Sequence, residues 1–183
     1  MRRDHLPHPS RTVGGVRSRH LRYIAAVPPC FDVYVWIQQD ARAGVLSRFI
    51  DRYVDVQNPG DPRFDAFVRT FVDQAPQRGD HDALRELRRD PAADRAFALY
   101  LHARQHHEAI ITVTEEGAVV LGIGLDDPDN APEVWERGAA LLASLRAEFA
   151  ALGGIGGVEL APPQSAAEWA EEALVQLRLG IAP

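Results

Sequence analysis

The chain has 183 residues, of which 46% are hydrophobic and 25% are charged, and its formal net charge is −6. These values are those of an ordinary globular protein, and the length fits one domain with a sizeable core. No apolar run approaches the roughly 20 residues that cross a membrane, so a membrane partner is not expected.

The single cysteine, Cys30, excludes an internal disulfide, and a reducing, cytoplasmic setting is the simplest interpretation. The local sequence VPPCFD offers no electropositive surroundings, so Cys30 is expected to be structural rather than reactive. All 20 of the Lys+Arg residues are arginine. This bias indicates GC-rich coding and predicts a bacterial source.

The charge is unevenly distributed along the chain. Residues 1–22 carry six arginines and one acid, whereas residues 97–183 carry four arginines and thirteen acids. Residues 1–22 also lack the apolar stretch of a secretory signal. They are predicted to form a basic, disordered and inert tail, and residues 23–183 are predicted to form a single domain.

The first secondary-structure signal is FDVYVWIQ, residues 31–38, whose alternation of β-branched and aromatic residues predicts a strand. A helix is predicted over residues 40–55, where apolar side chains recur at helical spacing. A second helix is expected to begin at Asp61 and Pro62. A third, shorter helix is expected over residues 81–89.

Three strands, a helix and a further strand are predicted next. Residues 96–106 favour a strand, but Ala, Leu, Arg and Gln are also good helix formers, and the sequence does not decide between the two. TEEG, residues 114–117, is the clearest hairpin turn. Asn130 and Glu133 have the spacing of a capping box before a long helix, and residues 152–160 lead into a short strand.

The final element is predicted to be a helix that begins at a capping box of Ser165 and Glu168 and ends at Gly180. Its buried side chains are expected to be Trp169, Ala173 and Leu177. The predicted order is that of an α+β protein: an antiparallel or mixed sheet of about five strands, with helices packed mainly on one face. It loosely resembles a ferredoxin-like split βαβ fold with a helical insertion.

The segment LHARQHHE, residues 101–108, is rich in groups that bind metals or move protons. In a helix, His102 and His106 would share one face, a spacing that suits a metal ion. A metal site needs at least a third ligand, however, and in a strand His106 and His107 would fall in the following turn. No metal and no other cofactor is therefore predicted.

One face of the predicted sheet gathers aromatic and polar side chains. The candidate binding residues are Tyr34, Trp36, Tyr100, His102 and Arg104, which include the types that dominate interaction hot spots. The same face should also carry Asp32, Gln38, Thr112, Thr114, Gly122 and Gly124. The final helix or the N-terminal segment would be the alternative occupant of this face, because an uncovered Trp36 is costly.

No phosphate-loop, dinucleotide-binding, nucleophile-elbow, zinc-finger or kinase motif is present, and no catalytic residue is predicted. The first hypothesis is a non-catalytic protein-interaction or regulatory module, such as an immunity-type protein, whose open face binds a protein partner or a second copy as a homodimer. The alternative is a small-molecule-binding protein or enzyme that uses His102, Tyr34, Tyr100, Arg104 and Glu108 on that face. Nucleic acid is not an expected partner, because the chain beyond the tail is net negative.

Overall fold

The computed structural model describes residues 29–37, 42–91, 95–127, 129, 131–171 and 173–181. The predicted tail and the predicted cap Asn130 lie outside the described residues. The elements are β1 (Cys30–Ile37), α1 (Arg42–Tyr53), α2 (Phe64–Phe67), the π-helix η2 (Val68–Val72), α3 (Asp80–Arg85), β2 (Phe97–His102), β3 (Glu108–Val113), β4 (Val119–Asp126), α4 (Pro132–Glu148), β5 (Gly153–Val158), α5 (Ala166–Ala170) and β6 (Leu177–Gly180). Among these helices none is long and apolar enough to cross a membrane.

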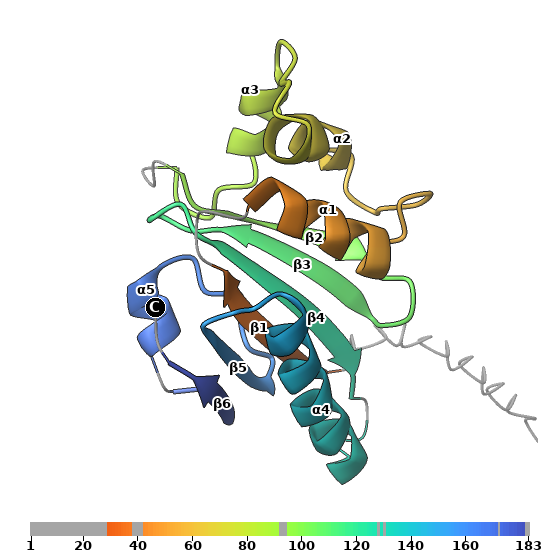
Figure 1. Cartoon of the computed structure of the whole chain (residues 1–183), viewed down its shortest axis with the longest axis vertical. Helices are drawn as coiled ribbons and strands as arrows, with labels where there is room; N and C mark the ends of the chain where they lie inside the picture. The colour runs from red at the N-terminus through yellow and green to blue at the C-terminus, as the bar shows by residue number, and fades with distance from the viewer. Residues whose placement is uncertain are drawn as a thin grey trace, which may run out of the picture.

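The described strands form one six-stranded sheet in the order β2-β3-β4-β1-β5-β6, and every neighbouring pair is antiparallel (Figure 1). This arrangement confirms the predicted α+β class. The four central strands, β3-β4-β1-β5, have the order of a ferredoxin-like split βαβ unit, and β2 and β6 extend it at the two edges. The strand prediction for residues 96–106 is also confirmed, since β2 occupies Phe97–His102.

The predicted final helix is correct only at its start. Ser165 Oγ accepts a hydrogen bond from Glu168 N at 3.1 Å, as the capping box requires, but α5 ends at Ala170 and Leu177 lies in β6. The glycines of β5 explain the difference, because they let the last segment approach closely: a Cβ on Gly153 would lie only 2.3 Å from Ile181 O. Sheet pairing therefore replaces the second half of the expected helix.

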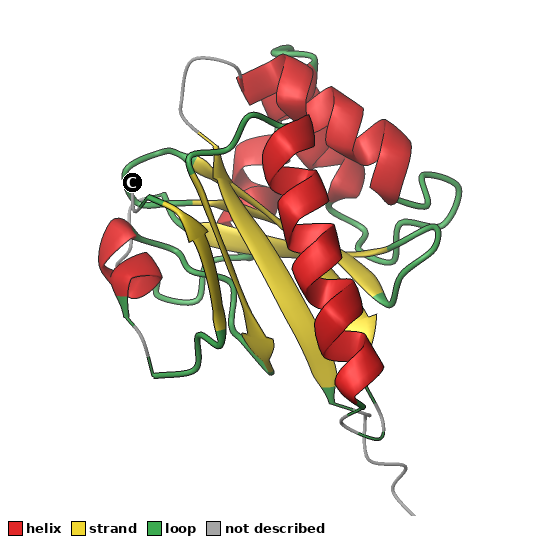
Figure 2. Ribbon diagram, turned by 60° about the horizontal axis from the view of Figure 1, so that its bottom comes forward, coloured by secondary structure: helices red, strands yellow, loops and turns green. Residues whose placement is uncertain are grey.

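Most helices cover one face of the sheet, as predicted. Figure 2 shows α4 and the helices around α1 on one side of the strands and the short α5 on the other. The larger core lies between the sheet and this helix layer, and α4 packs on β1 and β5. It contains the alternate strand residues Phe31, Val33, Val35, Leu99, Ile111, Leu121 and Ile123, with Phe49, Phe67, Leu142 and Leu145 from the helices.

The opposite face, here called the polar face, carries the other alternate residues of the strands. Its smaller core forms where Trp169 of α5 packs edge-on against Trp36, with ring centroids 5.4 Å apart. α5 thus covers the Trp36 end of this face, which is the alternative that the sequence left open. The other end, near the first residues of β1, borders a pocket of about 290 Å³.

Candidate functional site

Two of the five predicted binding residues are buried in the polar face. Tyr34 is 1% exposed, and its hydroxyl donates a hydrogen bond to Leu160 O at 2.8 Å. Gly122 on β4 makes room for the ring, because a Cβ there would lie 2.4 Å from Tyr34 Cε1. Trp36 is 3% exposed. Tyr34 nevertheless belongs to the lining of the pocket at the other end of the face.

The other three predicted residues come from β2 and the residues after it, and they separate. Tyr100 stays on the polar face and is 48% exposed. His102 Nδ1 lies 2.9 Å from Asn58 O, and Arg104 Nε donates to Val54 O at 2.8 Å. Both side chains therefore contact the segment after α1, which runs along the edge of β2. The structure brings Tyr34 and Tyr100 together, and it does not bring His102 and Arg104 to them.

The pocket at the open end of the polar face is acidic. Its lining consists of Cys30, Asp32, Tyr34, Tyr100, His107, Glu108 and Glu159, with residues 160–162 forming one wall. It contains three carboxylates, and no arginine is among its described lining residues. A site of this composition favours a positively charged ligand.

Asp32 and Glu108 approach each other across a glycine. In the strand register Gly124 lies between them, opposite Glu108 on one side and Asp32 on the other. A Cβ on Gly124 would lie 2.9 Å from Glu108 Cγ and 3.1 Å from Asp32 Oδ1. The two acidic side chains therefore occupy the space beside Gly124, which a larger residue at position 124 would fill.

Asp32 is held in an unfavourable environment for a charge. It is 5% exposed, and within the described structure its Oδ1 has no hydrogen-bond partner. Burial, followed by the negative charge of Glu108, raises the pKa of Asp32 to about 7, although a hydrogen bond from the Leu160 backbone opposes the shift. Burial also raises the pKa of Glu108. A cation or a proton would stabilise this pair.

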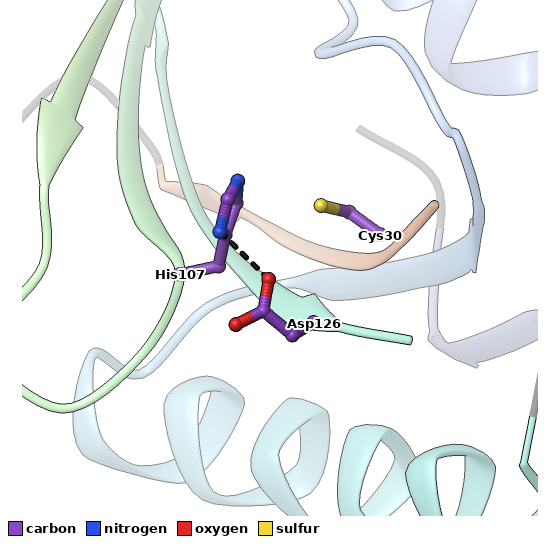
Figure 3. A group of neighbouring side chains, drawn as sticks. All are labelled: Cys30, His107 and Asp126. Carbon is purple, nitrogen blue, oxygen red and sulfur yellow. Dashed lines mark ion pairs between the residues drawn. The ribbon is translucent and has the colours of Figure 1, made fainter. Parts of the chain in front are cut away.

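A second group of side chains shares two residues, Cys30 and His107, with the lining of this pocket. Cys30 is the register partner of Asp126, and His107 directly precedes β3. Figure 3 shows the three side chains pointing toward one another from three different strand ends. His107 Nδ1 lies 2.8 Å from Asp126 Oδ1, and one potential ligand atom from each residue lies within 4.8 Å of the others. We call these residues the Cys30–His107–Asp126 triad.

The thiol of the triad lies in a negative field. Burial raises the pKa of Cys30 to about 11, and the charges of Asp32, Glu108, Asp126 and Glu159 contribute in the same direction. The thiol is thus protonated at neutral pH in the absence of a cation. The same carboxylates would attract a metal ion, which favours the thiolate.

The triad was not predicted from the sequence, because no single segment contains its three ligands. Residues 30, 107 and 126 are far apart in the chain, and VPPCFD contains nothing that marks Cys30 as a ligand. The signal that would have found them is the strand register, since β1 and β4 pair with Cys30 opposite Asp126. That register is a tertiary property.

The sequence matches no protein-family model, no curated protein and no solved structure. A functional conclusion for this chain therefore depends on the chemistry of its own residues.

Proposed function

We propose that this protein binds a divalent transition-metal ion at the acidic end of the polar face, with Cys30, His107 and Asp126 as ligands. The observation that carries the proposal is the convergence of a thiol, an imidazole and a carboxylate from three strand ends, with ligand atoms within 4.8 Å of one another. These are the ligand types that zinc prefers. The proposal departs from the sequence-based prediction that no metal is bound, and it shares with the small-ligand alternative only the pocket lined by Tyr34, Tyr100 and Glu108.

The surroundings of the triad support a bound cation. Asp32 and Glu108 line the pocket that Cys30 and His107 also line, and Asp32 Oδ1 is buried with no hydrogen-bond partner in the part of the chain that the structure describes. A divalent ion would offset the negative charge that the fold concentrates there. Glu159 Oε1 already accepts a hydrogen bond from Cys30 N at 3.0 Å, so it holds the backbone of one ligand in place.

Binding requires small side-chain movements. Ligand atoms about 2.0–2.3 Å from a tetrahedral zinc ion lie roughly 3–4 Å apart, so His107 Nδ1 and Asp126 Oδ1, now 2.8 Å apart, must separate slightly. His107 and Asp126 are exposed and free to adjust at low cost. Three protein ligands would leave a fourth coordination position for water or a substrate, as in catalytic zinc sites. A reduced Cys30 is required, and this fits the cytoplasmic setting expected from the sequence.

Cobalt titration tests the proposal directly. The full chain, purified without an affinity tag and stripped with a chelator, is titrated with Co²⁺. We expect a thiolate-to-cobalt charge-transfer band that Zn²⁺ abolishes by competition. Cys30→Ser should remove the band, and His107→Asn or Asp126→Asn should weaken binding about tenfold or more.

The matched control is His102→Asn, because His102 is an exposed histidine of the same segment whose ring bonds to Asn58 O outside the triad. It should bind cobalt like the parent chain. The proposal is wrong if the parent gives no thiolate band, or if the band survives in Cys30→Ser.

A second candidate function is self-association, which retains the interaction role expected from the sequence but moves it to a sheet edge. β6 is an outermost strand of the described sheet; Leu179 within it is 37% exposed, and Leu174 and Ile181 on either side of it are 57% and 68% exposed. An edge strand with exposed apolar side chains tends to pair with another chain. Two copies of β6 paired antiparallel would form a symmetric dimer.

Light scattering after size-exclusion chromatography tests this second candidate. We expect the parent chain to be dimeric and the double variant Leu179→Asp with Ile181→Asp to be monomeric. Val56→Asp, at a 37% exposed apolar position in the turn after α1, is the control and should stay dimeric. A monomeric parent chain would exclude the β6 dimer and would leave the metal proposal untouched.

A further inference from the structure

A larger pocket, of about 540 Å³, lies on the helix side of the molecule, apart from the polar face. Its lining comes from the start of α1, from η2 and α3, from the start of β2, and from the end of β3 with the turn that follows. The lining residues are Arg42, Thr70, Phe71, His81, Leu84, Arg85, Arg88, Arg95, Phe97, Val113, Glu116 and Gly117. The volume falls within the range of small-molecule sites, about 300–1,000 Å³. We call it the basic pocket.

The basic pocket combines positive charge with an apolar wall. Four arginines and one histidine line it, against a single carboxylate among the described lining residues, that of Glu116. Glu116 Oε1 accepts a hydrogen bond from Ala166 N. The apolar part of the lining includes Phe71 and Phe97, whose ring centroids are 5.8 Å apart. The ligand that complements both parts carries an anionic group on an apolar body.

Two polar groups in this pocket are buried without partners. Within the described structure, Arg42 Nε and Thr70 Oγ1 are inaccessible to solvent and make no hydrogen bond. Burial lowers the pKa of Arg42, and the described ion pairs do not include it. Unsatisfied buried donors are rare in native proteins, and they are expected where a ligand supplies the missing acceptor.

The local backbone explains how Thr70 reaches this position. Thr70 lies in η2, a wider turn than that of an α-helix. Here Asp73 N donates a hydrogen bond to Val68 O, and Ala75 N donates one to Arg69 O. Single π-turns of this kind recur at functional sites because they displace a side chain from its regular helical direction. Arg69 in the same turn is already paired with Asp80 at 2.6 Å, so the turn is anchored beside Thr70.

We propose that the basic pocket binds an organic oxyanion, a phosphate ester or a carboxylate, attached to a flat apolar group. Arg42 and the rim arginines Arg88 and Arg95 bind the oxyanion, Thr70 Oγ1 donates to it, and Phe71 and Phe97 contact the apolar group. Guanidinium groups suit this role because their paired N–H donors match the oxygens of carboxylates and phosphates. The site is independent of the proposed metal site.

Calorimetry with four small probes tests the ligand class. The full chain, in the presence of a chelator, is titrated with phenyl phosphate, phenylacetate, inorganic phosphate and benzyl alcohol. We expect at least one of the two aryl oxyanions to bind about tenfold or more tightly than inorganic phosphate and benzyl alcohol. Which of the two binds identifies the anionic group. Equal affinity for inorganic phosphate, or no binding of either aryl oxyanion, overturns the proposal.

Two substitutions separate a binding role from a structural one. Arg42→Met should weaken binding of the aryl oxyanion about tenfold or more, and Thr70→Val should weaken it about threefold or more. Neither should lower the melting temperature of the ligand-free chain, because each removes a buried group that has no hydrogen-bond partner among the described residues. Unchanged affinity in both variants would overturn the proposal, as would a clear loss of stability in both.

The control is Arg48→Met. Arg48 is an exposed arginine of α1 that lies over the Phe149 ring at 5.6 Å and is outside the pocket. It should keep the parent affinity, and a loss equal to that of Arg42→Met would show that overall charge, not the pocket, determines binding. Arg95→Met at the rim provides a further variant should Arg42→Met not fold, and it too should weaken binding.

Discussion

Replacing Asp32 with asparagine should remove a pH-dependent loss of stability. Folding raises the pKa of this carboxyl from 3.8 to about 7, because burial and then Glu108 disfavour its charged form. The folded chain thus holds a proton that the unfolded chain releases, so the stabilisation is complete below pH 3.8 and is lost as the pH rises to about 7. Since a tenfold change in proton affinity is about 1.4 kcal/mol, the loss amounts to about 4 kcal/mol.

Asp32→Asn replaces the carboxyl with a neutral group of the same shape. We expect the variant to match the parent within about 1 kcal/mol near pH 4 and to exceed it by a few kcal/mol near pH 8. The measurement is urea unfolding followed by tryptophan fluorescence across this range, with a chelator present so that no metal contributes. The control is Asp51→Asn on the exposed side of α1.

Parallel stability curves for the parent and Asp32→Asn would refute this reasoning. They would mean that Asp32 titrates alike in the folded and unfolded chains, and hence that the pocket does not disfavour its charge. A variant less stable than the parent at every pH would instead show that the Asp32 carboxylate is paired in solution.

Three further predictions concern stability. Phe49→Ala and Leu145→Ala, at positions with 0% exposure, should each cost about 2–5 kcal/mol in urea melts, and less than about 1 kcal/mol would show that the helix layer is loosely packed. Trp36→Ala should cost about 3–5 kcal/mol, because it empties the space against Trp169; an unchanged melting curve would show that α5 does not stay docked. Zn²⁺ at a hundredfold excess over its Kd should stabilise the chain by about 2.7 kcal/mol in calorimetry, and Cys30→Ser should abolish the gain.

Local patterns determined most of the elements. The alternation of FDVYVWIQ predicted β1, and the helical spacing around Phe49 predicted α1, because a half-buried element must place its apolar residues on one side. TEEG predicted the β3–β4 turn, where Gly117 adopts a φ of 77°. The composition of the polar face also followed from period-two alternation, and it correctly placed Asp32, Tyr34 and Tyr100 on one side of the sheet.

Local patterns could not determine how that face is used. Whether α5 covers Trp36, and whether His102 turns toward the pocket or toward Asn58, depends on contacts between segments that are distant in the chain. Residues 177–180 show the same limit: they were predicted to end a helix, but the glycines of β5 offer a partner strand, and they pair with it instead. These outcomes depend on contacts between distant segments, and the sequence of one segment holds no information about them.

Both proposed sites also depend on contacts between distant segments. Cys30, His107 and Asp126 meet because β1 and β4 pair in one register and β3 begins beside them. Arg42 and Thr70 line one pocket because α1 and η2 pack against each other. The sequence by itself determined five of the six described strands, most helices and the face on which acids and aromatics gather. Only the tertiary structure decided which of these side chains share a pocket, because register and helix docking set distances between residues that the chain keeps apart.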